Sequence, residues 1–69
     1  MEIKWTYAYN GNIIIVKRSM TLELYINDVL HDQKSDDSQN LSLRGVLPTG
    51  ETIRAEIDIV RSECLIFVE

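Results

Sequence analysis

The stretch WTYAYNGNIIIV, residues 5–16, decides the fold. Aromatic residues alternate with small or polar ones up to Asn10-Gly11, and an apolar run, Ile13–Val16, follows. Asn-Gly between two such runs predicts a hairpin, because a type I′ turn needs positive φ at both central residues. This hairpin would pair Trp5 with Val16 and Tyr7 with Ile14, so that these four side chains share one face.

The same alternation recurs in the second half of the chain. Thr52–Val60 carries apolar residues on one face and polar or charged residues on the other, as in an antiparallel sheet with one face in water. A strand through Leu41 and Leu43 precedes it, joined by Leu47-Pro48-Thr49-Gly50, where proline presets φ and glycine accepts a left-handed conformation. A last strand is expected over Glu63–Val68.

The segment Thr21–Gln33 fits two structures. As a strand pair, Leu22, Leu24 and Ile26 alternate before a turn at Asn27-Asp28. As a helix, its apolar residues recur at helical spacing. Several poor helix formers favour the strand pair, although its register places His31 opposite Leu24 and brings two like charges together, Glu23 and Asp32.

We therefore expect one small all-β domain over residues 1–69, an antiparallel meander of six to seven short strands in a small sandwich or curled sheet. The alternative is an α+β fold with a helix around residues 21–34. A polar loop at 34–40 would separate a four-strand part from a three-strand part. In a sandwich, Thr52–Val60 would lie on the outside, and the two doubly apolar strands would fill the middle: Ile13–Val16 and Cys64–Val68.

Composition narrows the class of protein. A chain of 69 residues is too short for a multidomain enzyme, and its net charge of −4 argues against nucleic acid or an anionic membrane as partner. A single cysteine forms no internal disulfide, which favours the reducing cytoplasm. The start of the chain lacks the apolar run of a signal peptide, and no apolar run approaches the roughly 20 residues that span a membrane.

Five motifs together suggest a family resemblance. They are Trp5-x-Tyr7, Asn10-Gly11-Asn12, Leu24-Tyr25-x-Asn27, Leu47-Pro48-x-Gly50-Glu51-x-Ile53 and Ile66-Phe67-Val68. In them the chain resembles small uncharacterised bacterial cytosolic all-β proteins and is distantly similar to a strand-rich unit of the Fas apoptotic inhibitory molecule. The resemblance implies an all-β meander, a non-enzymatic role and no functional residues to transfer. The chain departs from the usual Asn-Gly at its second turn by carrying Asp28.

Isolated chemical groups do not predict a catalytic site. His31 lacks a partnered nucleophile or further ligands, and Cys64 belongs to an alternating series that predicts the core. Asp32, Asp36 and Asp37 lack the spacing and glycine of a calcium loop. We expect no enzyme, no catalytic residue, no cofactor and no metal.

The doubly apolar strands indicate a function. Apolar surface that the fold leaves uncovered predicts a partner interface, so we expect a non-catalytic interaction module that binds another protein or a second copy of itself. It would act through a sheet face or an edge strand, anchored by Leu65 and Phe67 or by Trp5 and Tyr7. If the fold covers all four side chains, they belong to the core instead. The alternatives are a ligand pocket lined by Trp5, Tyr7 and Tyr25, and an acidic inhibitor from a mobile element that uses Glu23, Asp32, Asp36 and Asp37.

Overall fold

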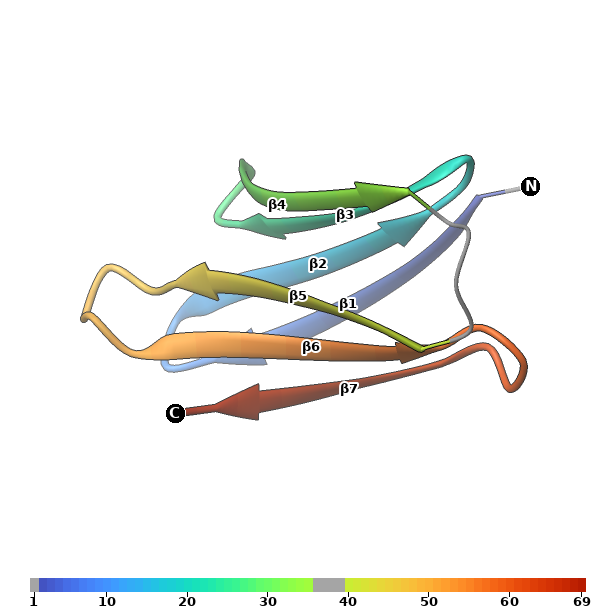
Figure 1. Ribbon diagram of the computed structural model, residues 1–69. Helices are drawn as coiled ribbons and strands as arrows, with labels where there is room; N and C mark the ends of the chain where they lie inside the picture. Colours follow the sequence, from blue (N-terminus) through green and yellow to red (C-terminus); the bar gives the residue numbers. More distant parts are fainter. Residues whose placement is uncertain (1, 36–39) are drawn as a thin grey trace.

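A computed structural model describes residues 2–35 and 40–69 of the chain, which form seven antiparallel strands and no helix (Figure 1). The all-β prediction is therefore confirmed. The strands form a four-stranded sheet in the order β1-β2-β3-β4 and a three-stranded sheet in the order β5-β6-β7. Their bounds are β1 Ile3–Tyr9, β2 Asn12–Arg18, β3 Thr21–Ile26, β4 Val29–Ser35, β5 Asn40–Val46, β6 Thr52–Asp58 and β7 Glu63–Val68.

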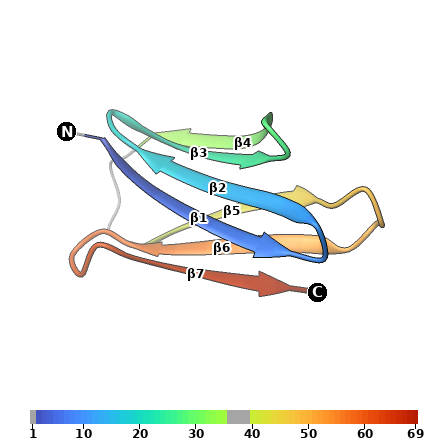
Figure 2. The ribbon, with the colours of Figure 1, turned by 180° about the vertical axis from the view of Figure 1, so that it is seen from behind.

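The two sheets pack face to face as a small sandwich, which Figures 1 and 2 show from opposite sides. Its core comes mainly from β2 and β3 in one sheet and from β5 and β6 in the other, because every second residue of each strand points inward. The fully enclosed apolar side chains are Ile14, Val16, Leu22, Leu24, Ile26, Leu43, Leu47, Ile53, Ala55 and Ile57.

The first hairpin has the predicted geometry. Trp5 pairs with Val16 and Tyr7 with Ile14, and both turn residues, Asn10 (φ 48°) and Gly11 (φ 77°), are left-handed. The β3–β4 turn has the same character, with φ values of 51° at Asn27 and 67° at Asp28. The strand pair over this segment is thus confirmed, and the helical alternative is wrong.

The predicted register of that second hairpin holds only near its turn. Tyr25 pairs with Leu30, but a β-bulge then shifts β4 by one residue, so that Leu24 faces Asp32 instead of His31. Glu23 therefore faces Gln33, whose Nε2 lies 3.4 Å from the Glu23 carboxylate and donates to it. The bulge replaces a repulsive carboxylate pair by a hydrogen bond.

Four further boundaries or placements differ from the predictions. β6 ends at Asp58 rather than Val60, and it is the central strand of its sheet rather than an outer one. Of the doubly apolar strands, β2 is interior but β7 is an edge strand. Both ends of the predicted loop at 34–40 lie in strands, since β4 continues to Ser35 and β5 starts at Asn40; residues 36–39 lie outside the described part.

The two long sides of the sandwich differ. On one side, which we name the closed side, β4 of the first sheet approaches β5 of the second (Figure 1). On the opposite side, the open side, lie the edge strands β1 and β7 (Figure 2). The closed side needs a glycine, because a Cβ on Gly45 would lie 2.8 Å from Ile26 Cδ1 and 3.0 Å from His31 Cβ.

We expect Gly45→Ala to lower the free energy of unfolding by about 1–3 kcal/mol, because the added methyl group overpacks the β3–β5 contact. Urea unfolding measures the loss. Ile26→Val removes the Cδ1 atom that the new methyl would strike, so the double variant should lose less than the sum of the two single losses. Ser42→Ala, on the same strand, should change stability by less than about 0.5 kcal/mol; an equal effect of Gly45→Ala would contradict this packing.

Candidate interaction surface

Side chains of β4 cover the free edge of β5. The Arg44 N–H donates to Asp32 Oδ2 at 2.9 Å, and the Val46 N–H donates to His31 Nδ1 at 3.5 Å. Both N–H groups point away from β6, where a further strand could otherwise pair with them. The β4 bulge is what brings these two neighbouring residues to β5.

Near the start of β7, one backbone group of its free edge has a hydrogen-bond partner from β1. Thr52 and Glu69 exchange both backbone hydrogen bonds. Because hydrogen-bonded and non-hydrogen-bonded pairs alternate in an antiparallel ladder, the backbone N–H and C=O groups of Cys64, Ile66 and Val68 point away from β6. The Tyr7 hydroxyl donates to the Cys64 carbonyl oxygen at 2.5 Å. This bond from β1 ties the two edge strands together and removes one acceptor from the edge.

The outer edge of β1 is different. The Asn27 N–H donates to the Ile13 carbonyl, so the backbone N–H and C=O groups of Ile13 point to β3. Those of its partner Ala8 therefore point away from β2. By alternation, the N–H and C=O groups of Lys4, Thr6 and Ala8 all face the open side. Within the described part of the chain, none of these six groups has a hydrogen-bond partner in the fold. Six aligned backbone groups are a template for a further strand.

The inward side chains along the open side are also incompletely covered. Trp5 and Tyr7 pack against the core but stay half-buried, whereas their partners on β2, Val16 and Ile14, are 0% exposed. On β7, Ile66 is half-buried in the same way. The open side therefore combines free backbone groups with partly exposed aromatic side chains.

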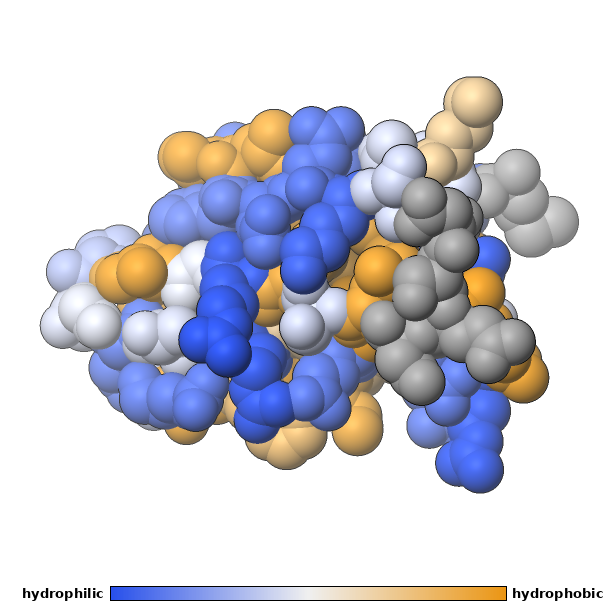
Figure 3. Space-filling model, viewed as in Figure 1, coloured by the Kyte–Doolittle hydropathy of each residue, from blue (hydrophilic) through white to orange (hydrophobic). Residues whose placement is uncertain are grey.

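The two predicted anchor pairs lie on different surfaces. Trp5 and Tyr7 face inward on the open side, whereas Leu65 and Phe67 lie on the outer face of the second sheet, 56% and 37% exposed. The Arg54 guanidinium covers the Phe67 ring at 4.5 Å. Figure 3 shows polar residues over most of the face in view, with apolar residues in separate patches.

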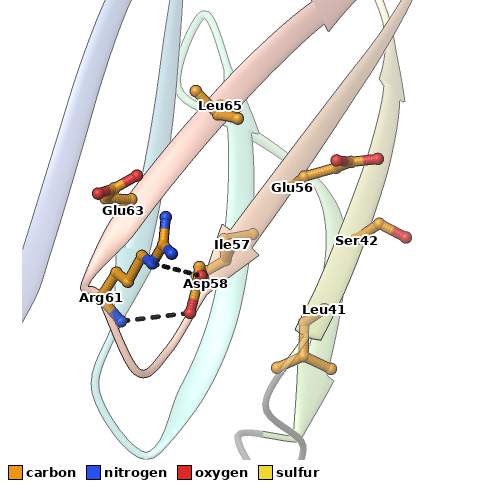
Figure 4. Close-up of a pocket in the computed structure, with 8 residues that line it drawn as sticks. All are labelled: Leu41, Ser42, Glu56, Ile57, Asp58, Arg61, Glu63 and Leu65. Atoms are coloured by element: carbon orange, nitrogen blue, oxygen red, sulfur yellow. Dashed lines mark hydrogen bonds and ion pairs between the residues drawn. The ribbon is translucent and has the colours of Figure 1, made fainter.

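A hollow of about 400 Å³ lies beside Leu65 on this outer face (Figure 4). Its polar lining includes the carboxylates of Glu56, Asp58 and Glu63. These groups do not converge, because Arg61 turns back to Asp58 and the side chains of Glu56 and Glu63 lie at opposite ends of the view (Figure 4). In residues 2–35 and 40–69 there is no group of three or more metal-ligating side chains that could hold an ion.

The residues of the two alternative functions are not gathered either. Tyr25 lies on the outer face of the first sheet, under Lys17 at 4.9 Å, away from the inward-facing Trp5 and Tyr7. Glu23 accepts a hydrogen bond from the Tyr25 hydroxyl, and Asp32 is turned toward β5. Asp36 and Asp37 lie outside the described residues.

His31 and Cys64 lie on opposite sides of the sandwich, His31 on the closed side and Cys64 on the open side. Burial raises the pKa of the Cys64 thiol from 9.0 to about 11, against a smaller opposing effect of the hydrogen bond with Tyr7. A thiol with this pKa stays protonated near neutral pH and is a poor nucleophile. This agrees with the predicted core position of Cys64.

Two asparagines that the sequence predicts only as turn or motif residues, Asn12 and Asn27, hold the turns of the first sheet together. Asn27 Nδ2 donates to Asn12 Oδ1 at 2.9 Å, and the Ile13 N–H donates to Asn27 Oδ1 at 3.0 Å. Asn12 is buried, and both ends of its amide have partners: Oδ1 accepts from Asn27, and Nδ2 donates to the carbonyl oxygens of Tyr9 and Asn10 at 3.3 Å each. The signal was present in the sequence, since both residues stand at or next to a two-residue turn.

Comparison with models of protein families, with curated proteins and with solved structures gave no match. The resemblance described above therefore stays a prediction. Among the described residues, no helix has the length and apolar character needed to cross a bilayer.

We expect Asp32→Ala to expose the β5 edge. Amide hydrogen exchange at Arg44 should accelerate at least about tenfold, and unfolding free energy should fall by about 1–2 kcal/mol, because a charge-assisted hydrogen bond is lost. NMR-detected exchange measures the first effect and urea unfolding the second. Gln33→Ala, on the same strand, should leave exchange at Arg44 unchanged. Equal exchange at Arg44 in wild type and Asp32→Ala would show that this bond does not protect the edge.

We expect Cys64 to react slowly with iodoacetamide in the folded protein. At pH 8 the raised pKa lowers its thiolate fraction about 100-fold relative to an ordinary thiol, and burial slows access further. The rate should rise with pH without levelling off below about pH 11, the folded-state pKa. Mass spectrometry with and without denaturant measures this, and native labelling as fast as denatured labelling would contradict the burial of Cys64.

Proposed function

We propose that this protein is a non-catalytic, cytoplasmic protein-interaction module whose outer β1 edge takes up an extended strand of a partner. The observation that carries the proposal is the contrast among the β1, β5 and β7 edges. The β5 edge is covered by Asp32 and His31 and the β7 edge is partly capped by Tyr7, whereas Lys4, Thr6 and Ala8 keep free donors and acceptors.

The chemistry of strand addition fits this edge. The six backbone groups would supply main-chain hydrogen bonds, which give affinity with little dependence on sequence. Alternate side chains of the added strand would point inward beside Trp5 and Tyr7, whose partly exposed rings offer apolar contacts and selectivity. Lys4 is the one charged residue of β1, so the edge carries little of the charge that normally discourages pairing.

Proline scanning of the edges tests this proposal. Thr6→Pro removes an N–H group that faces the open side, so the fold should persist while strand addition is lost. Val68→Pro is the matched control, because it removes an edge-facing N–H from β7. Circular dichroism and thermal unfolding check that both variants fold.

The probe is a displayed library of random extended peptides of about strand length. Peptides selected on the wild type should lose at least about tenfold in affinity for Thr6→Pro and keep their affinity for Val68→Pro. On peptide binding, the amides of Lys4, Thr6 and Ala8 should gain protection from hydrogen exchange. Peptides that bind Thr6→Pro as well as wild type, or protect none of these amides, would rule out the β1 edge as the binding site.

A further inference from the structure

We infer that the strand taken up by the β1 edge is β1 of a second copy, paired antiparallel about a two-fold axis at Thr6. This inference rests on the proposed use of the β1 edge and names its occupant. It is carried by the self-complementarity of residues 3–9 in one register.

The backbone groups of two such strands match. With Thr6 opposite Thr6, Lys4 of each copy faces Ala8 of the other, and these are the residues whose N–H and C=O groups point outward. Three pairs with two hydrogen bonds each would satisfy all six free groups on each strand, making six bonds in total. The full length of β1, Ile3–Tyr9, takes part.

The side chains match as well. Trp5 of each copy faces Tyr7 of the other in a non-hydrogen-bonded pair, the type that brings side chains closest, and aromatic pairs stabilise such positions. On the outer face, Thr6 meets Thr6 and Lys4 meets Ala8. Lys4 therefore has no like charge opposite, and beyond the strand Glu2 would face Asn10.

Other registers and another edge fit less well. Centring the pair on Trp5 or on Tyr7 leaves two residues of each β1 strand unpaired, and the second choice places Lys4 opposite Asn10, whose φ of 48° ends the strand. Self-pairing of β7 centred on Ile66 would set Glu63 against Glu69, and centring it on Leu65 needs the Cys64 carbonyl that Tyr7 occupies.

The proposed two-fold symmetry is also compatible with the two-layer architecture of the sandwich. A two-fold axis perpendicular to the first sheet keeps inward faces inward, so two four-stranded sheets would join into one of eight strands. Trp5 and Tyr7 of both copies would then lie side by side on the inner face. The half-buried Ile66 side chains of the two copies would flank the joined strands.

Analytical ultracentrifugation over a wide concentration range tests the association. The wild type and Val68→Pro should show a concentration-dependent dimer, whereas Thr6→Pro should remain monomeric. A wild type that stays monomeric at the highest concentration, or a dimer that persists in Thr6→Pro, would overturn the inference. In either case the peptide library still decides separately whether the β1 edge binds a foreign strand.

Disulfide trapping tests the register in a Cys64→Ala background. Thr6→Cys alone should form a cross-linked dimer under mild oxidation, because the two-fold axis brings its copies together. Lys4→Cys and Ala8→Cys should cross-link when mixed and not when each is alone. Cross-linking of Lys4→Cys or Ala8→Cys alone to the same extent as Thr6→Cys would overturn the register.

Discussion

The structure depends on one constraint: the outward backbone groups of its edge strands need partners. A sandwich of two short sheets has four edge strands, and here they are β1, β4, β5 and β7. Unpaired N–H and C=O groups at an edge are open to water or to another chain. Whether the fold itself supplies hydrogen-bond partners for an edge determines whether that edge is available to pair with another chain.

The closed side shows how few residues solve the problem. One bulge in β4 brings both Asp32 and His31 to the N–H groups of β5, and it also separates Glu23 from Asp32. Gly45 lets β5 come close enough for these bonds, since a Cβ there would strike Ile26. A shift of one residue in β4 therefore has two effects: it separates the Glu23 and Asp32 carboxylates, and it supplies partners for the N–H groups of the β5 edge.

The sequence was sufficient for the local features and insufficient for the long-range ones. Alternation and the turn residues predict the strands and the Trp5–Val16 register, because both are set by neighbours along the chain. The bulge at His31 could not be predicted, because the hydrogen bonds that stabilise it are made with Arg44 and Val46, which are distant in sequence. The placement of β7 at an edge likewise depends on sheet order. For the same reason the sequence leaves open which pair stays uncovered, Leu65 and Phe67 on the outer face of the second sheet or Trp5 and Tyr7 on the open side.

The turn at Asn10-Gly11 ultimately determines which groups β1 offers. A two-residue turn makes Tyr9 and Asn12 a hydrogen-bonded pair, so the odd-numbered residues of β1 bond to β2 and the even-numbered residues face outward. In Ile3–Tyr9 the central residue, Thr6, is therefore outward-facing, and a two-fold axis through it pairs the whole strand. Shortening the strand by one residue at either end would move its centre off Thr6 and leave the edge without this symmetry. The turn residues of the first hairpin thus also set the geometry of its free edge.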